Sequence, residues 1–160
     1  MIPFDRPQFT KLLKEAHIKP RLARTIRFAP ENIENWADRD FLPVTTKSGN
    51  EGVLIVSENA TLRAIIFSIA PLAASSAGIR KPIICDICHT WRRGTEAARI
   101  TLPRDDGSSV SYLCCGDLLC SLHVRDKTPA AALSRTQLRE NISLEGRVER
   151  LRRQLHAIVA

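Results

Sequence analysis

Long hydrophobic runs are absent from this sequence, and aromatic residues are few. No stretch approaches the roughly 18 to 20 consecutive apolar residues that a membrane span requires. The opening residues, MIPFDRPQF, carry an acid and prolines where a secretory signal peptide needs a basic and then an apolar run. We therefore expect a cytoplasmic protein that does not associate with membranes. Aromatic residues make up only 5% of the chain, which leaves few large side chains to anchor a core.

Signatures of catalysis are also missing. The sequence has no recognisable Ser-His-Asp arrangement, glycine-rich phosphate loop or paired-carboxylate motif. Its acids are scattered in the way that is typical of a solvated surface. We therefore predict that the protein is not an enzyme. A length of 160 residues fits one domain or two small lobes, and 44% apolar content is ordinary for a globular chain.

Positive charge is abundant but unevenly distributed, within a formal net charge of +7. Residues 1–30 hold seven Lys or Arg against two acids, and residues 121–160 hold eight against four. The middle of the chain is slightly acidic. Basic ends of this kind favour an anionic partner, such as ribosomal RNA or an acidic protein surface. A solvated surface that only aids solubility explains the same composition equally well.

The N-terminal forty residues are predicted to form short helices. Asp5 can cap a helix that begins near Pro7 and carries its apolar residues on one face. Pro20 interrupts this helix, and the segment RLARTIRF is expected to continue as a short basic helical turn. Pro30 marks another helix start, with Ile33 and Trp36 pointing the same way.

The pattern then changes to β-branched residues with a period of two. DFLPVTT, EGVLIVS and TLRAIIFSIA are separated by turn-forming clusters and predict three antiparallel strands in a meander. Weak alternation in VLIV and AIIF indicates strands covered on both faces. The segment PLAASSAGIRKP is typical of a linker. We therefore divide the chain into a lobe at residues 1–72, a linker at 73–82 and a second domain at 83–160.

The second domain opens with the cysteine pair of CDIC. ARITL and SVSYL then flank an Asp-Gly turn and predict a β-hairpin, and a cysteine-rich stretch follows directly. Residues 129–141 are expected to be a mixed loop or a short helix. Ser143 can cap a last helix with apolar residues at steps of three and four: Leu144, Val148, Leu151, Leu155 and Ile158.

The five cysteines indicate a metal site. An odd number of cysteines without an export signal argues against a disulfide framework. Two pairs, each held by a tight turn, can supply the four ligands of a tetrahedral zinc site. Cys85 and Cys88 have the two-residue gap of a zinc knuckle, and Cys120 pairs with either Cys115 or Cys114. The order of pair, hairpin, pair and helix is that of a treble-clef zinc finger, so the predicted fold is α+β: short N-terminal helices and a small meander, a treble-clef lobe and a C-terminal helix.

Other interpretations of the cysteines are weaker. Buried apolar cysteines do not explain two clusters that flank a hairpin. A redox site at CDIC would need a βαβ setting that the chain does not offer. His89 or His123 could replace one sulfur as a ligand. Four thiolates would leave no open position for water, so we predict one structural zinc ion and not a catalytic one.

The residues around the second pair resemble a known family. The run from Cys115 to Arg125, CGDLLCSLHVR, is similar to the Cys-x-Asp-Leu-x-Cys-Ser-Leu-x-Val-Arg run of the FusB-type, elongation-factor-G-binding proteins, also called fibronectin-binding-like. WADRDFL, beginning at Trp36, and the helix around Arg147 resemble segments of the same family. The resemblance favours Cys115 over Cys114, which gives Cys85, Cys88, Cys115 and Cys120 as ligands.

The resemblance implies a non-enzymatic protein that binds elongation factor G, mainly through the zinc-finger lobe, in association with the ribosome. In the resistance members, this binding frees the factor from ribosomes stalled by fusidic acid. The alternative is a zinc-containing protein that binds rRNA or the ribosome through its basic ends. Salt dependence separates the two, because phosphate contacts weaken steeply as salt rises.

Residues near the finger are candidates for partner contact, since Trp and Arg dominate interface energetics. We expect an exposed patch there, although Trp91 could instead cover the zinc knuckle. Arginines of the last helix fit a solvated face better than a contact with RNA. The predicted partner-binding residues are Trp91, Arg92, Arg93, Tyr112, His123 and Arg125.

Overall fold

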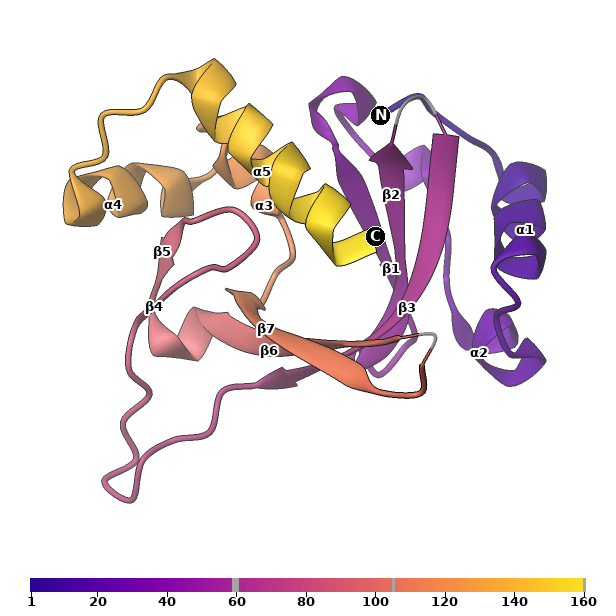
Figure 1. The fold of residues 1–160 in the computed structure, drawn as a ribbon, viewed down its shortest axis with the longest axis horizontal. Coiled ribbons are helices and arrows are strands. Elements are labelled where there is room, and N and C mark those ends of the chain that lie inside the picture. Colours follow the sequence, from indigo (N-terminus) through magenta and orange to yellow (C-terminus); the bar gives the residue numbers. More distant parts are fainter. Residues whose placement is uncertain (59–60, 105, 160) are drawn as a thin grey trace. The chain divides into compact units, whose positions relative to one another are not determined.

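A computed structural model of the chain describes residues 1–58, 61–104 and 106–159. It contains short helices, an antiparallel sheet and a C-terminal helix (Figure 1), which confirms the predicted α+β class. The helices are α1 (Arg6–Glu15), α2 (Pro20–Thr25), α3 (Cys120–His123), α4 (Pro129–Leu138) and α5 (Leu144–Val159), with 3-10 turns η1 (Pro30–Asn32), η2 (Trp36–Asp38) and η3 (Gly94–Glu96). The strands are β1 (Phe41–Thr45), β2 (Glu51–Glu58), β3 (Thr61–Pro71), β4 (Ile83–Ile84), β5 (Trp91–Arg92), β6 (Ala97–Pro103) and β7 (Ser109–Cys115).

The chain forms two compact units. The first unit comprises residues 1–68 and 102–108, and the second comprises residues 69–101 and 109–160. Five strands are hydrogen-bonded in the order β1-β2-β3-β6-β7, and β4 pairs with β5 in a separate hairpin. Residues 102–108, at the tip of the β6-β7 hairpin, therefore belong to the first unit. No local sequence pattern predicts this long-range association.

In the first unit, α1 begins as the sequence predicts. The Asp5 carboxylate accepts the Gln8 backbone N–H at 2.8 Å, and the Gln8 side chain accepts the Asp5 backbone N–H at 2.8 Å. This reciprocal capping box satisfies two backbone donors that the first helical turn would otherwise leave unpaired. Phe9 and Leu13 lie on the inner face of the helix and are buried.

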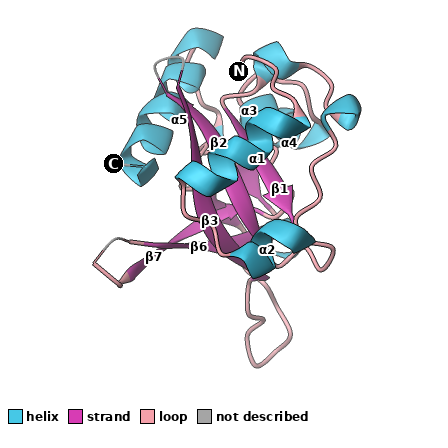
Figure 2. Cartoon of the chain, turned by 90° about the vertical axis from the view of Figure 1, so that its right-hand side faces the viewer, coloured by secondary structure: helices cyan, strands magenta, loops and turns pink. Residues whose placement is uncertain are grey.

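The scarce aromatic residues gather in the core of this unit. The Phe28 ring stacks on Phe4 at 5.0 Å and on Phe9 at 4.5 Å between centroids. Trp36 meets the edge of Phe4 at 5.1 Å. Such pairs contribute about 0.5–1.5 kcal/mol each beyond the burial of their area. α1 and α2 lie against one face of the meander (Figure 2), and their apolar residues join those of β1 and β2 in one cluster.

The meander has the predicted antiparallel pairing. β1 pairs with β2 from Phe41 opposite Val56 to Thr45 opposite Gly52, and β2 pairs with β3 along its length. Val53 to Val56 are all buried, so both faces of β2 are covered as expected. In β3, by contrast, Phe67 is the buried position and Ala64 to Ile66 are half-buried. The weak alternation of AIIF therefore overstated the covering of this strand.

In the second unit, α5 is the predicted amphipathic helix. The Ser143 hydroxyl accepts the Gly146 backbone N–H at 3.1 Å, which confirms the expected cap. Leu151 and Leu155 are buried, whereas Leu144 in the first turn is 43% exposed. α5 packs against α3, and α4 packs against β5. The segment at 129–141, expected to be a loop or a short helix, contains a ten-residue helix that begins at Pro129.

Candidate metal centre

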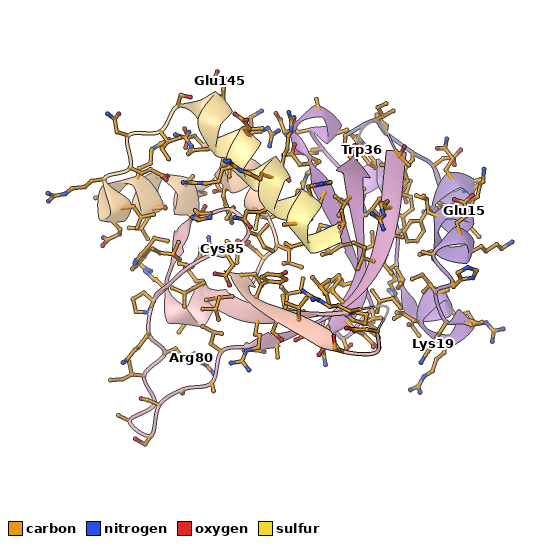
Figure 3. The ribbon with its side chains drawn as sticks, viewed as in Figure 1. Glu15, Lys19, Trp36, Arg80, Cys85 and Glu145 are labelled. Atoms are coloured by element: carbon orange, nitrogen blue, oxygen red, sulfur yellow. The ribbon has the colours of Figure 1, made fainter. Side chains whose placement is uncertain are left out.

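The first cysteine pair lies on a tight turn between β4 and β5. Cys85 follows β4 directly (Figure 3), and its backbone bonds with Thr90 and His89 close the turn. The Cys88 backbone N–H points at Cys85 Sγ, 3.5 Å away. His89 has a positive φ of 58°, the left-handed conformation that reverses the chain after the pair. This local geometry is that of a zinc knuckle.

Asp86, inside the knuckle, fixes this turn against β7. Its backbone N–H donates to the Leu113 carbonyl at 2.8 Å, and its carboxylate accepts the Leu113 N–H at 2.6 Å. No motif or spacing in the sequence indicates a role for Asp86. The structure shows that this side chain positions the first pair beside the strand that carries Cys115.

The second pair bridges the end of β7 and the start of α3. Cys115 ends the strand, Cys120 opens the helix, and Leu118 between them has a positive φ of 53°. The Leu118 N–H donates to the Cys115 carbonyl at 3.0 Å, and the Asp117 carboxylate accepts the Leu119 N–H at 3.0 Å. This left-handed turn accommodates a gap of four residues while returning Cys120 to the metal position.

Four sulfurs converge in the interior of the second unit. Sγ atoms of Cys85, Cys88, Cys115 and Cys120 all lie within 4.8 Å of one another, and all four residues are buried. Cys85 Sγ is 3.9 Å from Cys120 Sγ, and Cys88 Sγ is 3.6 Å from Cys115 Sγ. Four sulfurs bonded tetrahedrally to zinc at about 2.3 Å would be separated by about 3.8 Å. The donor set and its spacing therefore fit one structural zinc ion.

Cys114 lies outside this cluster. It is fully buried like its neighbour, but its sulfur is not among the four that converge. Successive side chains of a strand point to opposite faces, so Cys114 and Cys115 cannot both face the metal. Burial raises the pKa of the Cys114 thiol, and negative charge on Cys85 raises it further. Cys114 therefore behaves as a small apolar core residue.

The four sulfurs lie close enough to shift one another's pKa values. Burial alone would raise the pKa of Cys85, but hydrogen bonds from Cys115, Cys120 and Cys88 outweigh it and place that pKa well below the ordinary value. Hydrogen bonding with Cys115 and Cys85 raises the pKa of Cys120 well above its ordinary value. The four sulfurs therefore do not ionise alike. The Thr90 hydroxyl accepts a hydrogen bond from Cys88 Sγ at 3.1 Å. A divalent ion would hold all four sulfurs as thiolates.

A polar network lies beside the second pair, where buried Arg92 and His123 meet the exposed Asp117. Arg92 donates to the Asp117 carboxylate at 3.0 Å, and His123 Nε2 lies 3.1 Å from the same carboxylate. His123 Nδ1 is 2.6 Å from the Thr128 hydroxyl. Burial alone would raise the pKa of Asp117, but its bonds with His123 and the Leu119 N–H and the charge of Arg92 lower it. Asp117 therefore stays ionised and holds the α3 segment to β5.

This network corrects the expected exposure of two predicted contact residues. Arg92 is 6% exposed and His123 is 2% exposed, so neither side chain is available at the surface. The sequence shows only TWRR. The two arginines differ because Arg92 ends β5 and Arg93 follows in extended conformation, where successive side chains face opposite sides. Arg93 is exposed, whereas Trp91, Tyr112 and Arg125 are half-buried. The backbone N–H of Trp91 donates to Ser134 of α4, and Arg125 donates to the Ser121 carbonyl.

Neither histidine is needed as a metal ligand. His123 is close to Cys115 and Asp117 in a second group of potential ligands, but its ring nitrogens are engaged by Asp117 and Thr128. Within the described residues, His89 belongs to no such group. Four sulfurs complete a closed tetrahedral set without either ring.

The fold and the site define a treble-clef zinc-finger protein. A knuckle with two cysteines, a hairpin that ends in the third, and a helix that starts at the fourth are all present around four buried sulfurs. The family model of the FBP C-terminal treble-clef zinc-finger matches residues 20–160, and the chain belongs to this FusB-type family. No curated protein and no solved structure matched the chain. Among the described helices, none combines the length and the apolar character needed to cross a membrane.

Proposed function

We propose that the protein acts by binding elongation factor G and promotes its release from the ribosome, without catalysing a reaction. Membership of the FusB-type zinc-finger family carries this proposal, because the family resemblance covers the finger itself. A closed set of four sulfurs supports a structural role for zinc, since no ligand position is left for a reacting water. The proposed setting is the cytoplasm.

A rigid zinc lobe is well suited to docking. Four metal bonds and the Asp117 network order the finger before a partner arrives, so binding immobilises few further side chains. Arg93 is exposed just after β5, and Tyr112 is half-buried on β7, so the metal site would hold both segments in place. We place the partner contact on these two side chains, and we assign Arg92 and His123 to the support of the lobe.

Binding of the purified, zinc-loaded chain to immobilised elongation factor G tests this proposal. Arg93→Ala and Tyr112→Ala should each weaken binding by about tenfold, the effect of removing an interface hot spot of 1–2 kcal/mol. Lys47→Ala, which removes an exposed charge from the first unit, is the matched control and should bind as the native chain does.

Salt dependence distinguishes the proposal from direct binding to ribosomal RNA. The complex with elongation factor G should persist at high salt, because a docked protein interface depends less on charge than phosphate contacts do. Ribosomes carrying the factor should lose it when the chain is added. No complex with the factor at low or high salt would contradict the proposal.

A further inference from the structure

A set of exposed cations without acidic partners lies on α1 and α2 and directly beside α2 in the first unit. Five exposed Lys and Arg residues make up this surface, and none forms an ion pair with an acid in the part of the chain that the structure describes. Lys19, labelled in Figure 3, lies at the junction of the two helices. We call this the α1-α2 cationic surface: Lys14, Lys19, Arg21, Arg24 and Arg27.

Neighbouring cations of the same unit are neutralised. Arg6 pairs with Glu31 at 2.6 Å, and Lys11 pairs with Glu15 at 3.7 Å. Glu15 is the single acid between Lys11 and Arg27, and its partner is Lys11, outside the surface. The five positive charges of the α1-α2 cationic surface therefore have no compensating charge from their own segment.

Packing leaves this surface polar. Leu13, Ile18 and Ile26 are buried in the core of the first unit, and Leu22 packs against it. The outer side of both helices consequently carries the cations without a large apolar side chain among them. A membrane-inserting helix needs exposed apolar residues, and a protein interface typically uses aromatic anchors. Neither kind of residue is available here.

The charge arrangement also disfavours a purely structural explanation. Arg21 and Arg24 are three residues apart on α2, a spacing that puts two side chains on one face of a helix, where like charges repel. α2 has only six residues, and no side-chain cap compensates for this repulsion. A polyanion with closely spaced charges would turn the repulsion into attraction.

We propose that the α1-α2 cationic surface binds the phosphate backbone of RNA without reading its sequence. Recognition of phosphates follows from the cations alone, whereas the choice of RNA over DNA rests on the proposed function at the ribosome. Lys14 and Lys19 lie outside residues 20–160, the range matched by the family model, so this surface adds to the finger that the family defines.

Fluorescence anisotropy of a short, labelled single-stranded RNA tests the proposal with the full zinc-loaded chain. The variant carrying Arg21→Gln, Arg24→Gln and Arg27→Gln should bind at least about tenfold more weakly at low salt. Because each phosphate contact adds about −0.7 to the slope of log K against log salt concentration, the slope should become shallower by about two. Replacement of the same arginines by Lys should preserve the slope.

A matched control separates this surface from the net charge of the protein. Lys47→Gln, Lys81→Gln and Arg99→Gln together remove the same charge from exposed positions elsewhere and should leave affinity and slope unchanged. Equal losses in the two triple variants would overturn the proposal. Tighter binding of DNA than of RNA, or arginine-dependent binding of anionic vesicles or an acidic peptide in place of RNA, would also overturn it.

The same variants distinguish this proposal from the docking of elongation factor G. The triple Arg→Gln variant should retain the factor at high salt while it loses RNA, since the predicted factor contacts lie on the finger. If the triple variant lost the factor but still bound RNA, the assignment of this surface to RNA would be contradicted. If the native chain did not bind the factor, the RNA measurement would still test this surface by itself.

Discussion

Cys114 and Cys115 show how strongly a single position decides the role of a residue. Both are fully buried neighbours at the end of β7, yet the sulfur of Cys115 alone joins the three other converging sulfurs. The period of two in a strand sends the side chains to opposite faces. Spacing in the sequence left either cysteine possible, and the family resemblance favoured the one that the structure brings to the cluster.

Substitution of these two cysteines should therefore have opposite consequences. Cys115→Ser should lose the bound zinc and melt at a lower temperature, because a hydroxyl is a poor replacement for a thiolate ligand. Cys114→Ala should keep one zinc per chain, with a loss of about 1 kcal/mol or less for a small void. Zinc content by mass spectrometry and thermal denaturation check both variants. Full zinc retention by Cys115→Ser would contradict the assigned ligand set.

The burial of Arg92 and His123 marks a limit of prediction from local sequence. Both residues lie close to the finger, and their residue types favoured a contact patch. Their actual partner is Asp117, which lies 25 positions from Arg92 in the chain. Long-range pairing of this kind depends on the turn from Cys115 to Cys120, and that turn uses a left-handed Leu118 where glycine would be the usual signal.

At the scale of helices and strands, periodicity predicted most elements correctly. The meander, the hairpin and the last helix all follow from runs of β-branched residues, turn residues and helical periodicity. The ten-residue α4 was harder to predict. Thr128 caps it and Pro129 begins it, but its buried residues are the small Ala131 and Ser134, which give a weak apolar pattern. The helix is stabilised by its packing on β5, which the local apolar pattern does not indicate.

The start of α5 is held by one arginine of its first turn. Arg147 donates to the carbonyls of Val124 and Ile142 at 3.1 and 2.9 Å and to the Asp126 carboxylate at 2.7 Å. Its side chain is 13% exposed. The prediction of a solvated arginine face is therefore wrong for Arg147 and also for Arg150, which pairs with Glu140.

Arg147→Met should destabilise the second unit by about 1–3 kcal/mol, because two carbonyls and a carboxylate lose a donor. Arg153→Met, at an exposed position of the same helix, is the matched control and should change stability by no more than about 0.5 kcal/mol. Chemical denaturation of the two variants measures the difference. Equal effects would show that the Arg147 contacts do not stabilise α5.

Over the whole molecule, the candidate metal site belongs to one of the two units alone. The first unit has an apolar cluster that runs from Phe4 on the N-terminal segment to Ile55 on β2. The second unit contains all four converging cysteines, and its β4-β5 strands are only two residues long each. Short strands contribute few hydrogen bonds, so we infer that the metal carries much of the stability of the second unit.

Removal of zinc should therefore affect the two units unequally. Binding of a structural zinc ion is worth about 10–16 kcal/mol at neutral pH, which equals or exceeds the whole stability of a typical domain of about 5–15 kcal/mol. After chelation, backbone amides at 83–92 and 115–124 should lose protection from hydrogen exchange, while amides in α1 and in β2 retain it. Exchange measured by mass spectrometry on the full chain provides the comparison, and chelator saturated with zinc beforehand provides the control. Equal loss of protection in the two units would show that the metal stabilises the whole chain cooperatively, and unchanged protection at 83–92 would show that the finger folds without it.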